Sequence, residues 1–466
     1  MGDYFMMALA FVLVLGPLVV IHEFGHFIVA KYFGIRVEVF SVGFGKRLFG
    51  FKRGDTDYRV SLIPLGGYVK MSGENLDEQV TGAPYEFMSK PKWQRFFVAV
   101  AGPAVNILFA LLIPAVVSMF YFEEEAFRNQ PAQIYSVEAS SPAAAAGFQS
   151  GDTIMKIGDL TNPTWRDVDE YAIVRPGQTV PVTVKRGDQT KDLNLEIKTV
   201  DVGSDKIGIH GFIQDKAKIT ATSIAPGSPA AQAGLAEGDV ILSANGQPLE
   251  QSRQGVERLI ATINNSNGQP VQLTVERNGS EVEITPTPQM MDGKFKIGFA
   301  PSPQFDKIVK TKSLTEAIPY SFEENWRMVK LTATAIGQIF EGKRKVGETF
   351  SGPVGIAELS SQAVKAGPIV LFSLMALLSL NLGIFNLFPI PVLDGGLIFM
   401  LGLEAVLGFF GLPLTIKIKE KMIQVGFVAL MLLMGFIIYN DISKKISSKK
   451  APAVQQQVEQ PKPAEK

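Results

Sequence analysis

The chain has 466 residues, of which 46% are hydrophobic, and its 45 basic side chains are balanced by 45 acidic ones. Zero net charge gives no electrostatic footprint for nucleic acid. The chain contains no cysteine, which excludes disulfides and thiolate metal sites, and its length predicts several domains.

The first apolar stretch runs from Phe5 to about Ala30 and is predicted to be a membrane span within residues 1–34. It lacks a basic beginning and is too long for the apolar core of a cleaved signal peptide. Its only ionisable side chains are His22, Glu23 and His26. Polar groups of this kind are costly in a membrane helix and indicate a functional site.

The spacing of these three residues predicts a metal site. Histidines four residues apart lie on one face of a helix, so both His22 and His26 can reach one ion. Glu23 between them is placed to hold a metal-bound water and to take its proton. This pattern predicts a zinc protease that works inside the bilayer, with Glu23 as its catalytic residue and one zinc ion per chain.

Residues 35–95 are predicted to form a β region on the cytoplasmic side. Residues 37–42 and 58–63 alternate as strands do, and Arg53, Gly54 and Asp55 between them give a turn signal. Residues 31–95 carry 11 Lys or Arg against 7 acids. Basic short loops face the cytoplasm, so the N-terminus is expected outside.

Three more spans are predicted, at residues 96–122, 366–396 and 422–440. Residues 397–421 between the last two are expected to form an interfacial segment. Four spans return the C-terminus outside, whereas six lysines after Asp441 favour the cytoplasm for the tail. The low-complexity tail, residues 441–466, is predicted to be disordered.

The region between the second and third spans contains an internal repeat. Residues 141–154 align with residues 228–241, and each copy has a Pro-initiated short helix, a glycine stop, a Gly-Asp turn and a strand. Two small α/β modules are therefore predicted, at 128–215 and 216–305. Apolar residues at helical spacing then predict surface-lying helices within residues 306–365: Phe322, Trp326, Val329, Ile336 and Ile339.

A catalytic zinc site usually has three protein ligands and a water, so two histidines leave it one ligand short. The chain has one other histidine, His210, which is expected across the membrane from His22. The third ligand is therefore predicted to be a carboxylate from another membrane segment. Asp394 fits best, because Pro389 and Pro391 break the third span just before it. Glu404 is the second choice.

With these residues in view, the chain resembles the site-2 intramembrane zinc metalloproteases over about residues 5–445. The resemblance rests on His22-Glu-Phe-Gly-His26 and on Asn-x-x-Pro-x-Pro-x-Leu-Asp-Gly-Gly at 386–396. Motifs at 66–71, 101–106 and 351–356, with the repeated modules, narrow it to the RseP-type regulators of the sigma-E envelope stress response. One departure is Leu397, where relatives often carry a histidine that is not a metal ligand.

The resemblance implies a polytopic α-helical membrane protein with four transmembrane helices, a membrane-associated β-hairpin region and two inserted PDZ-like α/β domains. It implies a bacterial inner membrane location, periplasmic PDZ-like domains and an active site towards the cytoplasm. Asn386 and Asn381 would contact substrate, although helix packing is an equal alternative for Asn381. Asn106 is interpreted as structural.

The implied substrates are transmembrane segments of single-span proteins, namely an anti-sigma factor and remnant signal peptides, cut after their outer domain is trimmed. The PDZ-like domains would screen these substrates, or serve as spacers without a ligand. An exposed strand edge in 35–71 could hold an unwound substrate by strand addition. Two other functions are considered, a catalytically inactive membrane-anchored PDZ scaffold and a metal transporter.

Overall fold

The computed structural model describes residues 2–74, 81–138, 141–202, 205–215, 217–251, 253–291, 293–344, 347, 352–412 and 414–450. The chain divides into two compact units. The membrane unit comprises Met1–Tyr121, Val202–Asp205 and Thr311–Lys466, and the inserted unit comprises Phe122–Asp201 and Lys206–Lys310. Each unit is described by itself.

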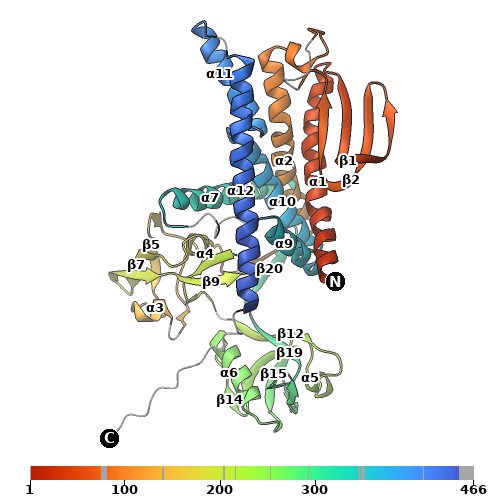
Figure 1. Ribbon diagram of the computed structural model, residues 1–466. Helices are drawn as coiled ribbons and strands as arrows, with labels where there is room; N and C mark the ends of the chain where they lie inside the picture. The colour runs from red at the N-terminus through yellow and green to blue at the C-terminus, as the bar shows by residue number, and fades with distance from the viewer. Residues whose placement is uncertain are drawn as a thin grey trace. The chain divides into compact units, whose positions relative to one another are not determined.

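Four helices of the described chain are long and apolar enough to cross a bilayer, as the sequence predicts. They are Phe5–Tyr32 of α1 (Gly2–Tyr32), α2 (Lys92–Phe120), α10 (Pro368–Asn386) and Lys417–Tyr439 of α12 (Ile416–Lys450). In the membrane unit these helices run alongside one another, together with α11 (Asp394–Phe409) (Figure 1). The protein is therefore a polytopic membrane protein.

Two helix ends differ most from the prediction. The third span ends at Asn386, because Pro389 and Pro391 cannot continue the hydrogen-bonding of a helix. The last helix continues to Lys450, since no glycine or proline interrupts residues 436–450. Residues 441–450 are thus helical where the sequence predicted a disordered tail, and residues 451–466 lie outside the described residues.

The segment predicted as interfacial, 397–421, is divided between two helices. Its first part belongs to α11, which begins earlier, at Asp394, and has 16 residues. That length is short of the roughly 20 residues needed to span a bilayer. Met400 and Leu401 of α11 are buried within the membrane unit.

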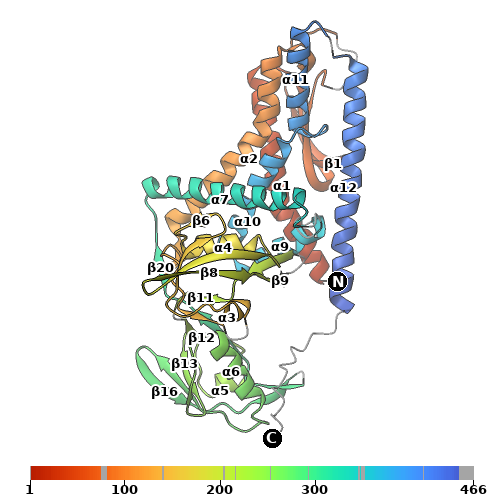
Figure 2. The same ribbon diagram turned by 90° about the vertical axis from the view of Figure 1, so that its left-hand side faces the viewer.

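Two further helices, α7 (Leu314–Phe340) and α9 (Pro353–Ala366), lie in the region predicted to contain linking helices. The α7 helix crosses α2 (Figure 2), where Ser321 donates to Leu111 O and Asn325 Nδ2 donates to Ala110 O at 3.2 Å. Its outer face exposes apolar residues four apart: Leu314, Ile318, Phe322 and Trp326. The first turn of α9 is held by Asp441 of α12, which accepts from two backbone amides.

The part of the chain that connects α1 to α2 forms a curved sheet made of two long strands, β1 (Val37–Arg53) and β2 (Thr56–Met71). Val39 pairs with both Lys70 and Asp57, so it has a neighbouring strand segment on each side. Each long strand therefore bends back, and its two halves form separate segments of the sheet. Figure 1 shows this sheet beside α1. Residues 67–71 form one of its edges. A 3₁₀ turn, η1 (Phe87–Ser89), precedes α2.

The first module of the inserted unit contains one four-stranded sheet, in the order β6-β5-β7-β8. Its core surrounds the fully buried Trp165 of α4. Its elements are β4 (Ser136–Val137), α3 (Pro142–Ala145), β5 (Thr153–Ile157), β6 (Leu160–Thr161), α4 (Trp165–Ile173), β7 (Thr179–Arg186), β8 (Gln189–Glu196), β9 (Lys198–Val202), β10 (Asp205–Ile209) and β11 (Phe212–Ile213).

The second module has a sheet of its own, with the path β16-β15-β13-β12-β19 and β14 on β13. Its elements are β12 (Lys218–Ile224), α5 (Pro229–Gln232), β13 (Val240–Ala244), β14 (Gln247–Pro248), α6 (Arg253–Asn264), β15 (Leu273–Arg277), β16 (Ser280–Ile284), β17 (Gln289–Met291), β18 (Lys294–Lys296) and β19 (Phe299–Gln304). Both ends of the unit pair as β3 (Phe122–Glu125) and β20 (Lys307–Lys310).

The internal repeat has the same local structure in both copies. Asp152 of the first copy forms two hydrogen bonds with Arg186, and Asp239 of the second does the same with Arg277. Burial alone would raise the pKa of Asp152, but the hydrogen bonds from Arg186 hold it below its usual range. The pKa of Asp239 is lowered in the same way. The aspartate of each Gly-Asp turn is therefore a buried carboxylate that pairs with a partly exposed arginine of the same module.

Candidate active site

The two histidines of the first span project from one face of α1, and α2 packs closely against them. Both imidazoles are buried, with 7% of each residue exposed. The close approach depends on Gly102 of α2, where a Cβ atom would lie 2.3 Å from His26 Nε2 and 2.8 Å from His22 Cε1. A side chain at position 102 would therefore occupy the space of the rings.

Asp394 reaches the histidines because the chain makes a tight turn between α10 and α11. Residues 387–393 are not helical, and Asp394 is the first residue of α11. Val392 in this turn has a φ of 97°, a strained conformation for a β-branched residue. A Cβ atom on Gly395 would lie 2.2 Å from Phe388 O, so the turn is too tight for a side chain there.

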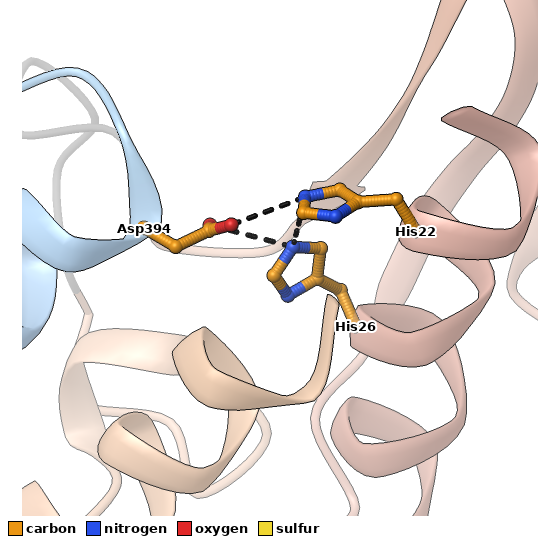
Figure 3. Close-up of side chains that lie close together, drawn as sticks. All are labelled: His22, His26 and Asp394. Atoms are coloured by element: carbon orange, nitrogen blue, oxygen red, sulfur yellow. Dashed lines mark hydrogen bonds and ion pairs between the residues drawn. The ribbon is translucent and has the colours of Figure 1, made fainter. Parts of the chain in front are cut away.

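Figure 3 shows that the three side chains point toward one another. His22 Nε2 lies 3.1 Å from Asp394 Oδ2, His26 Nε2 lies 3.3 Å from Asp394 Oδ1, and the two Nε2 atoms are 3.2 Å apart. A tetrahedral zinc ion with ligands at about 2.0–2.1 Å requires separations of about 3.3 Å between its ligands. The donor atoms are spaced as such a site requires.

The outer nitrogens of both rings are engaged by α2. His26 Nδ1 lies 2.7 Å from Val98 O, and since a carbonyl only accepts, Nδ1 carries a proton, which in the neutral ring leaves the lone pair on Nε2. His22 Nδ1 lies 3.1 Å from the amide of Asn106, a residue with no exposed surface. Such partners fix the orientation of metal-binding histidines.

The Asn106 amide is also informative about which ring nitrogen of His22 carries the proton. As placed, its Oδ1 is buried and has no hydrogen-bond partner among the described residues. Oxygen and nitrogen of an amide are assigned from their hydrogen bonds, and exchanging them gives Oδ1 a donor in His22 Nδ1–H. Both Nε2 atoms then face Asp394 as bare acceptors, an arrangement that a cation stabilises. The residues present fit zinc.

Glu23 lies next to this cluster and lines a cavity of about 430 Å³ with all three donor residues. Its Oε2 accepts from the backbone amide of Val69 at 3.1 Å. Val69 belongs to the edge of the β1/β2 sheet, so that edge faces the cavity. Other residues of the sheet also line it: Phe44, Gly66, Gly67 and Met71.

The two asparagines predicted to contact substrate are separated by the structure. Asn386 lines the cavity, and its Nδ2 lies 3.5 Å from His22 Nε2. Asn381 does not line the cavity. It lies five residues before Asn386 and therefore on a different face of the same helix. Its Oδ1 is buried without a hydrogen-bond partner among the described residues. Leu397 lines the cavity as an apolar side chain.

The alternative metal ligands lie elsewhere. Glu404 forms ion pairs with Lys419 and Arg95. His210 belongs to the inserted unit, where its Nε2 lies 2.9 Å from Asp169 Oδ1 and its Nδ1 accepts from Phe212 N. Among the described residues, the three-residue group able to hold a metal consists of His22, His26 and Asp394.

Two contacts at the site were not recognised from the sequence. Asn106 was interpreted as structural, whereas it contacts a histidine of the cluster. A polar amide in an apolar span was the available signal. The contact of Glu23 with Val69 uses a backbone amide, which no residue type identifies.

The chain belongs to peptidase family M50, whose model matches residues 10–433. Members of this family are zinc-dependent proteases, so the class of protein agrees with the geometry of the cluster. The predictions of a zinc cofactor and of a site-2 metalloprotease are confirmed.

Relatives match along nearly the whole chain. It is 33% identical to the regulator of sigma-E protease RseP of Escherichia coli (strain K12), covering 93% of this chain and 98% of the relative. It is 32% identical to protease RseP of Yersinia pestis, with the same coverage. A Vibrio cholerae protein whose name describes it as a zinc metalloprotease is 32% identical over 95% of this chain and all of the relative. The protein is an intramembrane zinc protease rather than a scaffold or a transporter.

Proposed function

We propose that His22, His26 and Asp394 hold the zinc ion and that Glu23 moves the proton in peptide hydrolysis. The observation that carries this assignment is the convergence of three side chains whose donor atoms lie 3.1–3.3 Å apart. Zinc bound there supplies a Lewis acid that polarises a carbonyl and makes a coordinated water nucleophilic near neutral pH.

Glu23 is positioned to act through one of its two carboxylate oxygens. Oε2 is held by Val69 N–H, so the other oxygen, Oε1, is the one proposed to act in the reaction. Oε1 takes the proton of the attacking water and then gives it to the leaving amine. The Val69 hydrogen bond orients the carboxylate, so the position of the catalytic group depends on the position of the sheet edge.

Asn386 is proposed to bind the substrate at the scissile peptide. Its amide lines the cavity and lies 3.5 Å from the nitrogen of a proposed zinc ligand. A side-chain amide at this place can donate to a carbonyl oxygen as negative charge develops on it. Asn381, which lies outside the cavity, is better interpreted as a helix-packing residue.

A transmembrane helix must unwind before its peptide groups can be attacked, because they are hydrogen-bonded within the helix. We propose that residues 66–69 of β2 hold the unwound substrate by strand addition. The hydrogen bond from Val69 N–H to Glu23 supports this, because it puts this edge of the sheet beside the proposed catalytic group. Strand edges commonly bind extended peptides in this way.

The two modules of the inserted unit are proposed to be PDZ-like domains that screen substrates on the periplasmic side. In the first module, a cavity of about 410 Å³ lies between α4 and β10 and is lined by Ile173, Ile207, Ile209 and Phe212. A groove between a strand and a helix suits an extended peptide. The substrates would be single-span inner-membrane proteins, an anti-sigma factor and remnant signal peptides, after trimming of their outer domain.

Cleavage of a tagged single-span substrate tests the catalytic assignment. Wild type, Glu23→Gln and Glu420→Gln are compared in the same membranes, with a substrate that has a short outer tail. Wild type and Glu420→Gln are expected to cut it, and Glu23→Gln is expected to leave it intact while retaining zinc. Equal cutting by Glu23→Gln would remove Glu23 from the mechanism.

A second substrate tests the screening. It has the same transmembrane segment but carries a folded outer domain, and it is expected to be cut at least tenfold more slowly than the short-tailed one. Equal rates would refute the proposed role of the PDZ-like domains without affecting the catalytic assignment.

A further inference from the structure

The beginnings of α2 and α12 meet beside α11 at a cluster of charged residues distinct from the zinc donors. A cavity of about 230 Å³ lies there, lined by Arg95 of α2, Lys419 of α12 and Glu404 of α11. Its far end is shared with the proposed zinc site through Glu74 and Asp394.

The cationic end of this cavity has more positive than negative charge. Lys419 forms an ion pair with Glu404, Arg95 Nη2 lies 3.7 Å from the same carboxylate, and Lys92 Nζ donates to the backbone oxygen of Glu404 at 3.1 Å. Two cations therefore contact the carboxylate of Glu404, and a third contacts its backbone oxygen. We refer to Lys92, Arg95, Lys419 and Glu404 as the basic cluster.

Arg95 is poorly satisfied for a buried guanidinium. Only 9% of the residue is exposed. Its Nε has no hydrogen-bond partner among the described residues, and Nη1 contacts the thioether of Met88 at 3.4 Å. A buried guanidinium normally has good acceptors, because leaving its donors unpaired is costly. An oxyanion in the cavity would supply them.

Two helix N-termini add to the positive potential. The α2 helix begins at Lys92 and α12 begins at Ile416, and neither has an acidic residue in its first turn. The N-terminus of a long helix carries a partial positive charge that favours anions. Both helices are membrane spans, so their beginnings lie where lipid headgroups are.

We propose that the basic cluster binds the phosphate of an anionic phospholipid headgroup. Arg95 and Lys419 contact the phosphate oxygens, and Lys92 lies at the outer edge. Apolar residues beside them (Met400, Leu401 and Ile423) offer the surface that the glycerol and the first acyl carbons require. Basic pockets between transmembrane helices bind anionic headgroups on this principle. Free phosphate shares the charge but gains nothing from that apolar wall.

The bound lipid would brace the helix that begins with Asp394. Glu404 lies on α11, whose first residue is that proposed zinc ligand, and Lys419 lies on α12. A phosphate between Arg95 and Lys419 ties α2 to α12 around α11 without touching the zinc donors. Lipid binding and zinc binding are thus separate properties of adjoining sites.

Lipid retention by the full-length protein tests the proposal. The protein is purified from nanodiscs of phosphatidylcholine containing phosphatidylglycerol, and bound lipids are counted by native mass spectrometry. Wild type is expected to retain one phosphatidylglycerol in preference to phosphatidylcholine. Lys419→Gln is expected to weaken retention about fivefold, the usual effect of one cation near a headgroup. Lys421→Gln, which changes an exposed lysine on the same helix, is expected to leave it unchanged.

Glu404→Gln distinguishes a lipid-binding site from a structural ion pair, because the two predict opposite changes in lipid retention. Removing the carboxylate makes the basic cluster more positive, so retention should rise several-fold. If Glu404→Gln instead weakens retention as much as Lys419→Gln, the cluster is an ion pair and the proposal is wrong. The double variant Glu404→Gln/Lys419→Gln restores the net charge of the basic cluster and should retain lipid near the wild-type level. It shows whether a single variant loses lipid because of its charge or because it is unstable.

Two further outcomes would overturn the proposal. Equal retention of phosphatidylglycerol and phosphatidylcholine by wild type would exclude a site selective for anionic headgroups. Complete displacement of the lipid by millimolar inorganic phosphate would assign the cavity to a small anion.

Discussion

Adding one methyl group behind the proposed zinc donors should disable the enzyme. Gly102→Ala places a Cβ atom 2.3 Å from His26 Nε2 and 2.8 Å from His22 Cε1, whereas an ordinary contact is at least 3.4 Å. The conflict involves the ligand atom itself, and both rings are buried with little room to turn away.

The expected loss of activity follows from how far His26 must move to make room for the methyl group. His26 Nε2 must move by about 1.1 Å to reach an ordinary contact with the new methyl group. Zinc sites require their ligands within a few tenths of an ångström, and a displacement of about 1 Å commonly reduces catalysis about 100-fold. We expect zinc affinity to fall at least tenfold and the cleavage rate about 100-fold.

Zinc content and substrate cleavage are measured on the same purified sample. Gly402→Ala in α11 and Gly435→Ala in α12 are matched controls, since nothing lies within 4 Å of a Cβ atom at either position. In a helix, alanine is more favourable than glycine by about 1 kcal/mol, so the controls should be as stable as wild type or more so. Full zinc content and activity in Gly102→Ala would refute the packing of α2 against the donors.

Three other predictions concern contacts that support the site or the inserted unit. Asn106→Leu removes the partner of a proposed zinc ligand and should lower zinc affinity 10- to 100-fold, measured by chelator competition. Val69→Pro removes the amide that holds Glu23, which should lower kcat about tenfold while zinc content is unchanged. Arg186→Met removes the cation that pairs with the buried carboxylate of Asp152 and should lower the protection of the first module, measured by hydrogen exchange of the full-length protein. The lowered pKa of Asp152 means that the stabilisation from this pair is present above about pH 4 and is lost as the pH falls further.

Each of these predictions has a control within the chain. Asn106→Asp keeps an acceptor for the histidine and should retain zinc better than Asn106→Leu. Val69→Ala keeps the amide and should retain kcat. Arg277→Met should loosen the second module and leave the first protected, since each ion pair lies within its own module. Loss of protection in both modules from either change would contradict independent cores.

The sequence predicts the four spans and the local metal motif because both signals are short-range. A run of about 20 apolar residues is sufficient to identify a span, and two histidines four residues apart share a helix face wherever the helix lies. Asp394 could also be predicted, because the prolines before it mark a break in an apolar segment. What it contacts depends on how α11 returns to α1, which hydropathy does not describe.

The contacts that were missed depend on residues distant in the sequence or on the backbone. Asn106 contacts His22 only because α2 packs against α1 at a glycine. Val69 is an ordinary strand residue whose amide reaches Glu23 because the sheet bends back on itself. The helical extension of α12 to Lys450 was not predicted, because the low-complexity composition of the tail indicates solubility and does not exclude a helix.

The proposed zinc donors are far apart in the sequence, at positions 22, 26 and 394, so the ribosome delivers them at different times. While the ribosome has delivered only α1 and α2, the membrane contains two histidines and a glutamate but no Asp394. A catalytic zinc site usually has three protein ligands, so we expect the unfinished protein to bind zinc weakly and to be inactive. Proteolytic competence arises only when α10 and α11 have inserted, after the whole inserted unit has been translated.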